Sequence, residues 1–267
     1  MIVRLMSMVL FAGFAMVALA DGPAVEFIAH RGASYDAPEN TVASFKLAWE
    51  QRADGAECDL YLTKDNQIVA IHDKTTKRTA GIEKIVAQCT LEELRALDVG
   101  TWKLERFRGE KIPTFAELLA TMPEGKKIYI EVKCGPEIVP ELLRQLHASR
   151  LPPQLTPVIC FNADVIAAVK QQSPQHPAYF LHSPEKITAE ELISKAKAIH
   201  ADGVDLKAVK ELDQAYAEKI HAAGLRLDVW TVNDVAEARR LIDLGVKGIT
   251  TDRPAYLREG LQLQSNR

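Results

Sequence analysis

"IAHRGASYDAPENT" (residues 28–41) begins as an apolar strand, stops on His30, Arg31 and Gly32, and continues as a polar loop. Ionisable side chains are rarely buried without partners, so a histidine and an arginine at the end of an apolar run indicate a role other than packing. In parallel α/β folds, ligand sites are lined by the residues that follow the strands. If the chain has such a fold, this stretch places a candidate site at the end of its first strand.

Short apolar runs alternate with amphipathic stretches from Val25 onward, which is the pattern of repeated βα units. Capping-box spacing marks several helix starts, including Thr90 with Glu93 and Thr114 with Glu117. The strands are expected at residues 25–29, 55–62, 128–132, 156–160, 177–181, 202–206, 226–231 and 247–250. Eight such units in a chain of 267 residues predict an α/β fold of the (β/α)8 TIM-barrel type, whose typical length is about 250 residues.

A ninth apolar run, residues 68–71, follows the second strand after a short polar link. A parallel crossover needs about a dozen residues or more, so this run is predicted to be the returning arm of a β-hairpin. The stretch 74–112 has little periodicity and contains Trp102 and Phe107. Hairpin and insert together, about residues 60–112, are expected to lie over the C-terminal mouth of the barrel. Because no repeat or linker interrupts the chain, residues 21–267 are expected to form a single domain.

Residues 1–20 have the features of a secretory signal peptide. Arg4 is the only charged side chain among them, residues 5–17 are apolar, and Ala18-Leu19-Ala20 places small residues at cleavage spacing. The apolar run is short for a membrane span of about 20 residues, so cleavage after Ala20 is favoured over a retained anchor. The chain is therefore expected to be exported, to the periplasm or the exterior, without stable membrane insertion afterwards.

Composition narrows the class of protein further. The net charge of −3 gives non-specific nucleic-acid binding no electrostatic support, so the expected partner is a small molecule. The four cysteines, Cys58, Cys89, Cys134 and Cys160, are far apart and show no CxxC spacing. An oxidising compartment would allow one disulfide among them, but the favoured interpretation is four small buried side chains.

Two strands end in acidic side chains that share a face. Glu57 and Asp59 alternate with Cys58 on the second strand, and Glu131 lies two residues before Lys133 on the third. Adjacent strands lie about 4.8 Å apart, so the three carboxylates are expected to meet inside the barrel. Buried carboxylates raise one another's pKa, and a hard divalent cation removes that conflict. A ligand set made only of oxygen atoms favours Ca²⁺ or Mg²⁺ over zinc, and both ions remain open.

Two histidines and two basic side chains are expected around this cation. His72 closes the hairpin and would return to the mouth opposite His30, where the two could transfer protons to and from a phosphoester. Arg31 and Lys133 would supply positive charge to its non-bridging oxygens. Glu39 and Asn40 precede the first helix at Thr41 and are candidates for shaping a phosphate-binding loop.

Seven motifs occur in an order that closely resembles the glycerophosphodiester phosphodiesterase family. They are His30-Arg31-Gly32, Pro38-Glu39-Asn40-Thr41, Glu57-x-Asp59, His72-Asp73, Glu131-x-Lys133, Trp230-Thr231-Val232-Asn233 and Thr251-Asp252-Arg253-Pro254. The resemblance covers residues 25–257. One departure is Cys160 before Phe161, where many relatives have serine, and this bears on packing or substrate fit.

The resemblance implies a barrel of the phospholipase-C-like phosphodiesterase group that cleaves glycerophosphodiesters to glycerol 3-phosphate and an alcohol. It implies attack by the glycerol 2-hydroxyl to give a cyclic phosphate, followed by attack of water. The implied residue roles are a divalent cation at Glu57, Asp59 and Glu131, acid/base catalysis by His30 and His72, phosphate binding by Arg31 and Lys133, and a glycerol-side wall at Trp230.

Two alternatives remain beside this prediction. A phospholipase D-type enzyme that acts on intact lipid headgroups would need an exposed apolar rim, for which the insert offers Trp102 and Phe107. A non-catalytic barrel that binds phosphoesters or Ca²⁺ would be expected to lack a histidine or a ligand carboxylate, and both sets are present.

Overall fold

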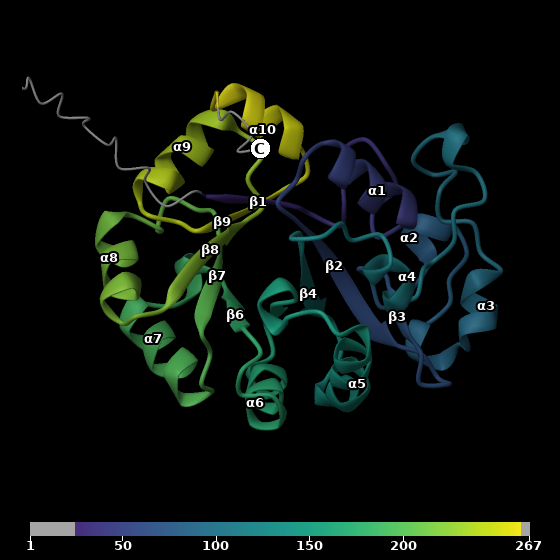
Figure 1. The fold of residues 1–267 in the computed structure, drawn as a ribbon, viewed down its shortest axis with the longest axis horizontal. Helices are drawn as coiled ribbons and strands as arrows, with labels where there is room; N and C mark the ends of the chain where they lie inside the picture. The colour runs from purple at the N-terminus through teal and green to yellow at the C-terminus, as the bar shows by residue number, and fades with distance from the viewer. Residues whose placement is uncertain (1–24, 263–267) are drawn as a thin grey trace, which may run out of the picture.

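A computed structural model describes residues 25–262 and confirms the (β/α)8 barrel (Figure 1). The eight parallel strands are β1 (Glu26–Ala29), β2 (Gly55–Leu62), β4 (Lys127–Val132), β5 (Val158–Cys160), β6 (Ala178–His182), β7 (Gly203–Lys207), β8 (Arg226–Trp230) and β9 (Gly248–Thr251). Each pairs in parallel with its neighbour, and β1 closes the ring by pairing with both β2 and β9. The closed ring brings the C-terminal ends of all eight strands to one mouth.

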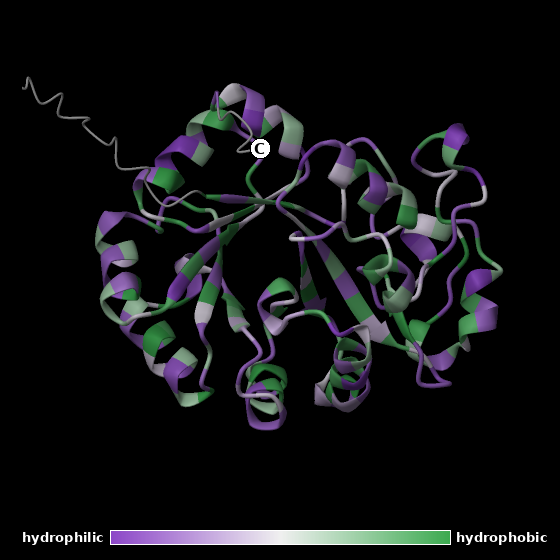
Figure 2. Ribbon diagram, viewed as in Figure 1, coloured by the Kyte–Doolittle hydropathy of each residue, from purple (hydrophilic) through white to green (hydrophobic). Residues whose placement is uncertain are grey.

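Helices surround the ring. Those that follow the strands are α1 (Val42–Glu50), α4 (Phe115–Leu119), α5 (Val139–Ser149), α6 (Ala163–Gln172), α7 (Ala189–Ala198), α8 (Gln214–Ala222), α9 (Val235–Asp243) and α10 (Pro254–Gly260). Figure 2 shows hydrophobic and hydrophilic residues alternating along them, because one side of each packs on the sheet. Cys58 and Val132 belong to the hydrophobic core between the sheet and the helices, as the alternation of side chains along their strands predicts.

The barrel interior is packed with side chains of its own. Ile28, Tyr129, Ile159, Tyr179 and Leu181 form a buried cluster from four different strands. This cluster separates the two ends of the barrel, so polar side chains at the mouth and at the floor form distinct groups.

The ninth run forms the predicted hairpin, since β3 (Ile68–Ala70) pairs antiparallel with β2. The insert contains α2 (Lys77–Ala80) and α3 (Leu91–Arg95), which lie at one side of the barrel (Figure 1). It has a small core of its own, built on Val69 and Ile71 of the hairpin with Val86 and Leu94. Its body therefore packs beside the barrel, while the end of the hairpin reaches the mouth.

The signal-peptide prediction for residues 1–20 lies outside the described residues. Within residues 25–262, no helix combines the length and the apolar character that a membrane span requires. Cys58, Cys89, Cys134 and Cys160 are all free thiols; Cys58, Cys89 and Cys160 are buried as expected, whereas Cys134 is only partly buried.

Candidate active site

The strand ends at the mouth surround a cavity of about 170 Å³. Seven of the ten residues predicted from the sequence line it: His30, Arg31, Glu57, His72, Glu131, Lys133 and Trp230. Asp59 and Glu39 lie behind Arg31 and form ion pairs with it, and Asn40 is hydrogen-bonded to Asp59. Drug-sized ligands occupy pockets of about 300–1,000 Å³, so this cavity suits a small polar group.

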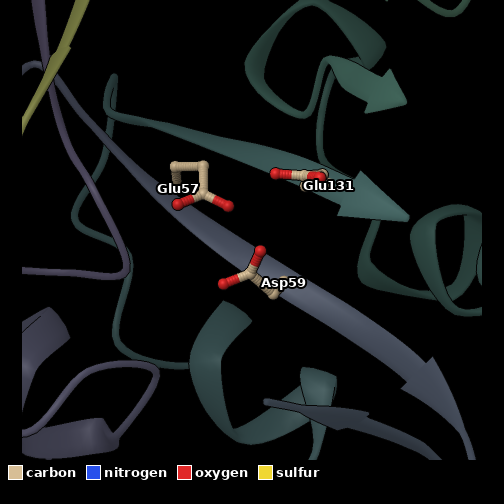
Figure 3. Close-up of side chains that lie close together, drawn as sticks. All are labelled: Glu57, Asp59 and Glu131. Carbon is tan, nitrogen blue, oxygen red and sulfur yellow. The ribbon is translucent and has the colours of Figure 1, made fainter. Parts of the chain in front are cut away.

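The three acidic side chains meet as expected. Glu57 and Asp59 project from β2 and Glu131 from the neighbouring β4, and their carboxylates face one another (Figure 3). One carboxylate oxygen of each lies within 4.8 Å of the other two. Among the residues that the structure describes, neither Glu57 Oε1 nor Asp59 Oδ1 has a hydrogen-bond partner, and both atoms are buried. Oxygen atoms in this arrangement fit a hard divalent cation, because its charge would satisfy the two unpartnered atoms.

The three carboxylates of this cluster repel one another when no cation lies between them. Burial raises the pKa of Glu57 well above its usual value, and the charges of Asp59 and Glu131 raise it further. Burial and Asp59 raise the pKa of Glu131 to about 7. Burial also acts to raise the pKa of Asp59, but Arg31 and Lys133 outweigh it and hold that pKa below its usual value. Only two basic side chains, Arg31 and Lys133, therefore balance three carboxylates, so a further positive charge would stabilise the ionised forms of the carboxylates.

Arg31 reaches the cluster through a turn in left-handed backbone. Its φ is 55° and that of Gly32 is 77°. A β-carbon on Gly32 would collide with the side chain and backbone of Ser44, so glycine alone fits this turn. The turn directs the Arg31 backbone N–H to Glu57 Oε2 at 2.9 Å, and it places Arg31 Nε 3.2 Å from Asp59 Oδ2. Lys133 Nζ donates to Glu131 Oε1 at 2.6 Å from the opposite side.

Each histidine is held by a carboxylate at Nδ1. His30 Nδ1 lies 2.7 Å from Asp252 Oδ1, and His72 Nδ1 lies 2.7 Å from Asp73 Oδ1. Although burial opposes it, hydrogen bonds from His30, Asn233 and Ser34 lower the pKa of Asp252 to about 2. A carboxylate can only accept a hydrogen bond, so Nδ1 donates in both pairs and Nε2 is free for proton transfer.

Arg78 connects two parts of the site that the sequence did not link. Its guanidinium donates two hydrogen bonds to Glu39, at 2.6 and 2.7 Å, and a third to Asp73 Oδ2 at 2.7 Å. Glu39 in turn accepts from Arg31 at 3.0 Å. A continuous chain of ion pairs thus runs from Arg31 through Arg78 to His72. No pattern around Arg78 in the sequence indicates this role, because its partners depend on how the insert packs.

Asn40 and Glu39 contact protein groups in the structure. Asn40 has a φ of 56°, in the left-handed region that asparagine tolerates, and its side chain bonds both the backbone and the carboxylate of Asp59. Asn40 therefore orients a candidate metal ligand, and Glu39 orients Arg31. Their assignment to substrate binding stays a prediction.

The wall opposite the carboxylates is aromatic. Trp230 at the end of β8 packs edge-to-face against Phe161, with ring centroids 5.6 Å apart. Its indole Nε1 donates to the backbone carbonyl of Asp205 on β7. The side chain of Asp205 also lines the cavity, although the sequence offered no motif to single it out.

Comparison with known proteins agrees with this architecture. Residues 30–256 match the family described as the glycerophosphoryl diester phosphodiesterase family. The chain is 35% identical over 237 residues to a glycerophosphodiester phosphodiesterase of Caldanaerobacter subterraneus, a match that covers 86% of this chain and 95% of that protein. It is 32% identical over 250 residues to one of Bacillus subtilis, covering 85% and 83%.

A solved structure extends the likeness to three dimensions. The phosphodiesterase of Oleispira antarctica, in complex with the product sn-glycerol-3-phosphate, superposes with a TM-score of 0.82. The identity is 27%, and the match covers 89% of this chain and 96% of that one. Fold and relatives together define a barrel enzyme of the phosphoric diester hydrolase class. More narrowly, the chain belongs to the glycerophosphoryl diester phosphodiesterase family.

Proposed function

We propose that this enzyme hydrolyses glycerophosphodiesters to glycerol 3-phosphate and an alcohol, using one divalent cation and two histidines. The observation that carries the proposal is the acidic cluster beside Arg31 and Lys133, in which two buried carboxylate oxygens accept no hydrogen bond from the described residues. The glycerol 3-phosphate bound to the Oleispira antarctica relative supports the choice of substrate class.

Glu57, Asp59 and Glu131 would hold the cation, which is Ca²⁺ or Mg²⁺ by the chemistry of its ligands. When bound, it would neutralise the carboxylates and stabilise negative charge on the phosphoryl group. Arg31 and Lys133 would bind the non-bridging oxygens on either side. Asn40 would keep Asp59 in place.

His72 is suited to begin the reaction as a base. Burial lowers its pKa below the usual value for histidine, so it is neutral at pH 7, with Nε2 able to accept the proton of the glycerol 2-hydroxyl. His30, fixed by Asp252, is then the group that protonates the departing alcohol. Water would open the resulting cyclic phosphate with the two roles exchanged.

The test measures release of glycerol 3-phosphate from a panel of glycerophosphodiesters, with and without chelator. Chelation, His30→Ala or Glu57→Ala should each lower activity at least about 10²-fold, the low end for loss of a general acid or base. His147→Ala, on the exposed side of α5, is the matched control and should change little. Full activity in the chelated enzyme or in His30→Ala would contradict the mechanism.

We also propose export, from the leader features of residues 1–20. The mature protein should then begin at Asp21 when it is recovered outside the cytoplasm. Amino-terminal sequencing of protein expressed from the full gene tests this, and an uncleaved cytoplasmic product would overturn it.

A further inference from the structure

Asp205 is a buried acid that the proposed mechanism does not use. It lies in the middle of β7, its side chain lines the cavity, and the residue is 1% exposed. Its Oδ1 is buried with no hydrogen-bond partner in the part of the chain that the structure describes. An unpartnered carboxyl oxygen in such a place is costly, so a ligand that satisfies it is expected.

The neighbouring acid shows that Asp205 does not belong to the barrel's structural ion pairs. Asp228 lies opposite Asp205 on β8, but both of its oxygens accept from Arg226 Nε at 2.9 Å and one also accepts from Tyr129. Asp205 is also not one of the three clustered carboxylates, which come from β2 and β4. The Asp205 side chain is therefore available to bind a ligand in the cavity.

The surroundings indicate what kind of group it would meet. Leu181 pairs with Asp205 on the adjacent strand, and Ile159 and Trp230 line the same part of the cavity. Burial and the charge of Asp228 raise the pKa of Asp205 well above its usual value. A carboxyl oxygen accepts a hydrogen bond whether or not the group is ionised, and a hydroxyl group can donate one to the unpartnered Oδ1.

We propose that Asp205 is a specificity-determining residue that binds the terminal hydroxyl of the substrate's glycerol group. This rests on the proposed function, because the 2-hydroxyl is taken as the nucleophile and only the terminal one is free. The small volume of the cavity and the burial of Asp205 favour glycerol over the alcohol, which has to leave towards solvent.

The experiment compares two substrates in three proteins. Glycerophosphocholine is set against 2-hydroxypropyl phosphocholine, which keeps the nucleophile and replaces the terminal hydroxymethyl group with methyl. The wild type should prefer the first in kcat/KM by at least about tenfold, since the analogue leaves a buried polar group unpaired. In Asp205→Leu, kcat/KM should fall on glycerophosphocholine alone, so the preference should be lost. The Asp205→Asn variant still donates and accepts hydrogen bonds at this position and should keep most of the preference.

Asp202→Asn is the matched control, because Asp202 pairs with Lys170 just before β7 and does not line the cavity. It should keep the wild-type preference. Asp205→Leu removes an unpartnered buried carboxyl, so thermal unfolding without substrate should show a folded protein. Equal losses on both substrates in Asp205→Leu, or no preference in the wild type, would overturn the inference. A wild type that hydrolyses neither compound would instead refute the proposed function.

Discussion

Acidic side chains lie at both ends of the barrel, and the two groups differ in how completely basic side chains and hydrogen-bond donors pair with them. At the floor, Glu26 and Asp228 are neutralised, with Lys127 and Arg226 as ion-pair partners and Tyr129 as an additional donor. At the mouth, two buried oxygens of the acidic cluster have no hydrogen-bond partner within residues 25–262, and the nearest base to one of them is Lys133, at 3.5 Å from Asp59 Oδ1. Of these two groups, only the one at the mouth is arranged to receive something from outside the chain.

This difference separates stability from function. A buried charge without a partner is unfavourable, so removing one member of a paired group lowers the stability of the fold. A partly paired group costs stability until a ligand arrives, which is the pattern of sites that give up stability for activity. Substitutions at the floor should therefore affect folding, and substitutions at the mouth should affect catalysis.

The largest expected effect is at the floor. Arg226→Met removes the partner shared by Glu26 and Asp228, so the free energy of unfolding should fall by about 3 kcal/mol. Urea denaturation measures this, and kcat/KM of the folded protein should stay within about twofold. Arg239→Met, exposed on α9, should change stability by at most about 0.5 kcal/mol. If Arg226→Met lost activity while its free energy of unfolding stayed unchanged, the proposed difference between the two ends of the barrel would be wrong.

Glu57→Gln should lower activity without lowering stability, which is the opposite of the result expected for Arg226→Met. Activity should fall at least about 10²-fold because a candidate ligand is lost. In chelator, however, the variant should be about 1 kcal/mol more stable than the wild type, because an amide replaces a carboxyl whose pKa is raised by burial. The wild type should also gain stability when Ca²⁺ or Mg²⁺ is added, and Glu57→Gln should gain less.

The matched control is Glu26→Gln at the floor, which makes the same chemical change. It should lose stability through weakened contacts to Lys127 and Arg226, and it should keep its activity. If both glutamines behaved alike in the two assays, the unpartnered oxygens at the mouth would not mark a ligand site.

The fold and the acidic cluster at the mouth could be predicted from the sequence, whereas the ion pairs at the floor were not. The eight strands and the hairpin follow from apolar runs and the lengths of their links, and Glu57, Asp59 and Glu131 face inward because side chains alternate along a strand. These inferences depend on local spacing within one element or on the order of neighbouring elements. That order is enough to bring the ends of parallel strands to one mouth.

Contacts between distant segments could not be predicted in the same way. Arg78 reaches Glu39 across 39 positions, and His30 reaches Asp252 across 222. Both depend on the packing of loops, for which no periodicity exists. The insert buries Val86 and Leu94 against the hairpin, and its Arg78 and Lys103 contact the loop that follows β1 at the mouth, and none of these contacts has a spacing in the sequence that predicts it.

Arg78→Met tests the link between the insert and the mouth. It should lower kcat/KM about tenfold, the range for a partner that orients an active-site group, because Arg31 and His72 both lose support. Stability should change little, since 42% of the Arg78 side chain is exposed. Arg95→Met is the control, because Arg95 pairs with Glu117 in a contact that involves none of the predicted site residues. Equal kinetics in the two variants would mean that the ion-pair chain does not position the site.

The smallest expected effect is a shift in the pH profile. Burial lowers the pKa of His72, and a base acts in its neutral form, so kcat/KM should fall as the pH drops through a midpoint below 6.5. The hydrogen bond to Asp73 opposes this shift, so Asp73→Asn should move the acidic limb to still lower pH, by less than about one unit. Asp243→Asn, exposed on α9, should leave the limb in place. A limb above pH 6.5, or one that rises in Asp73→Asn, would show that His72 is not the base and that the histidine roles must be exchanged.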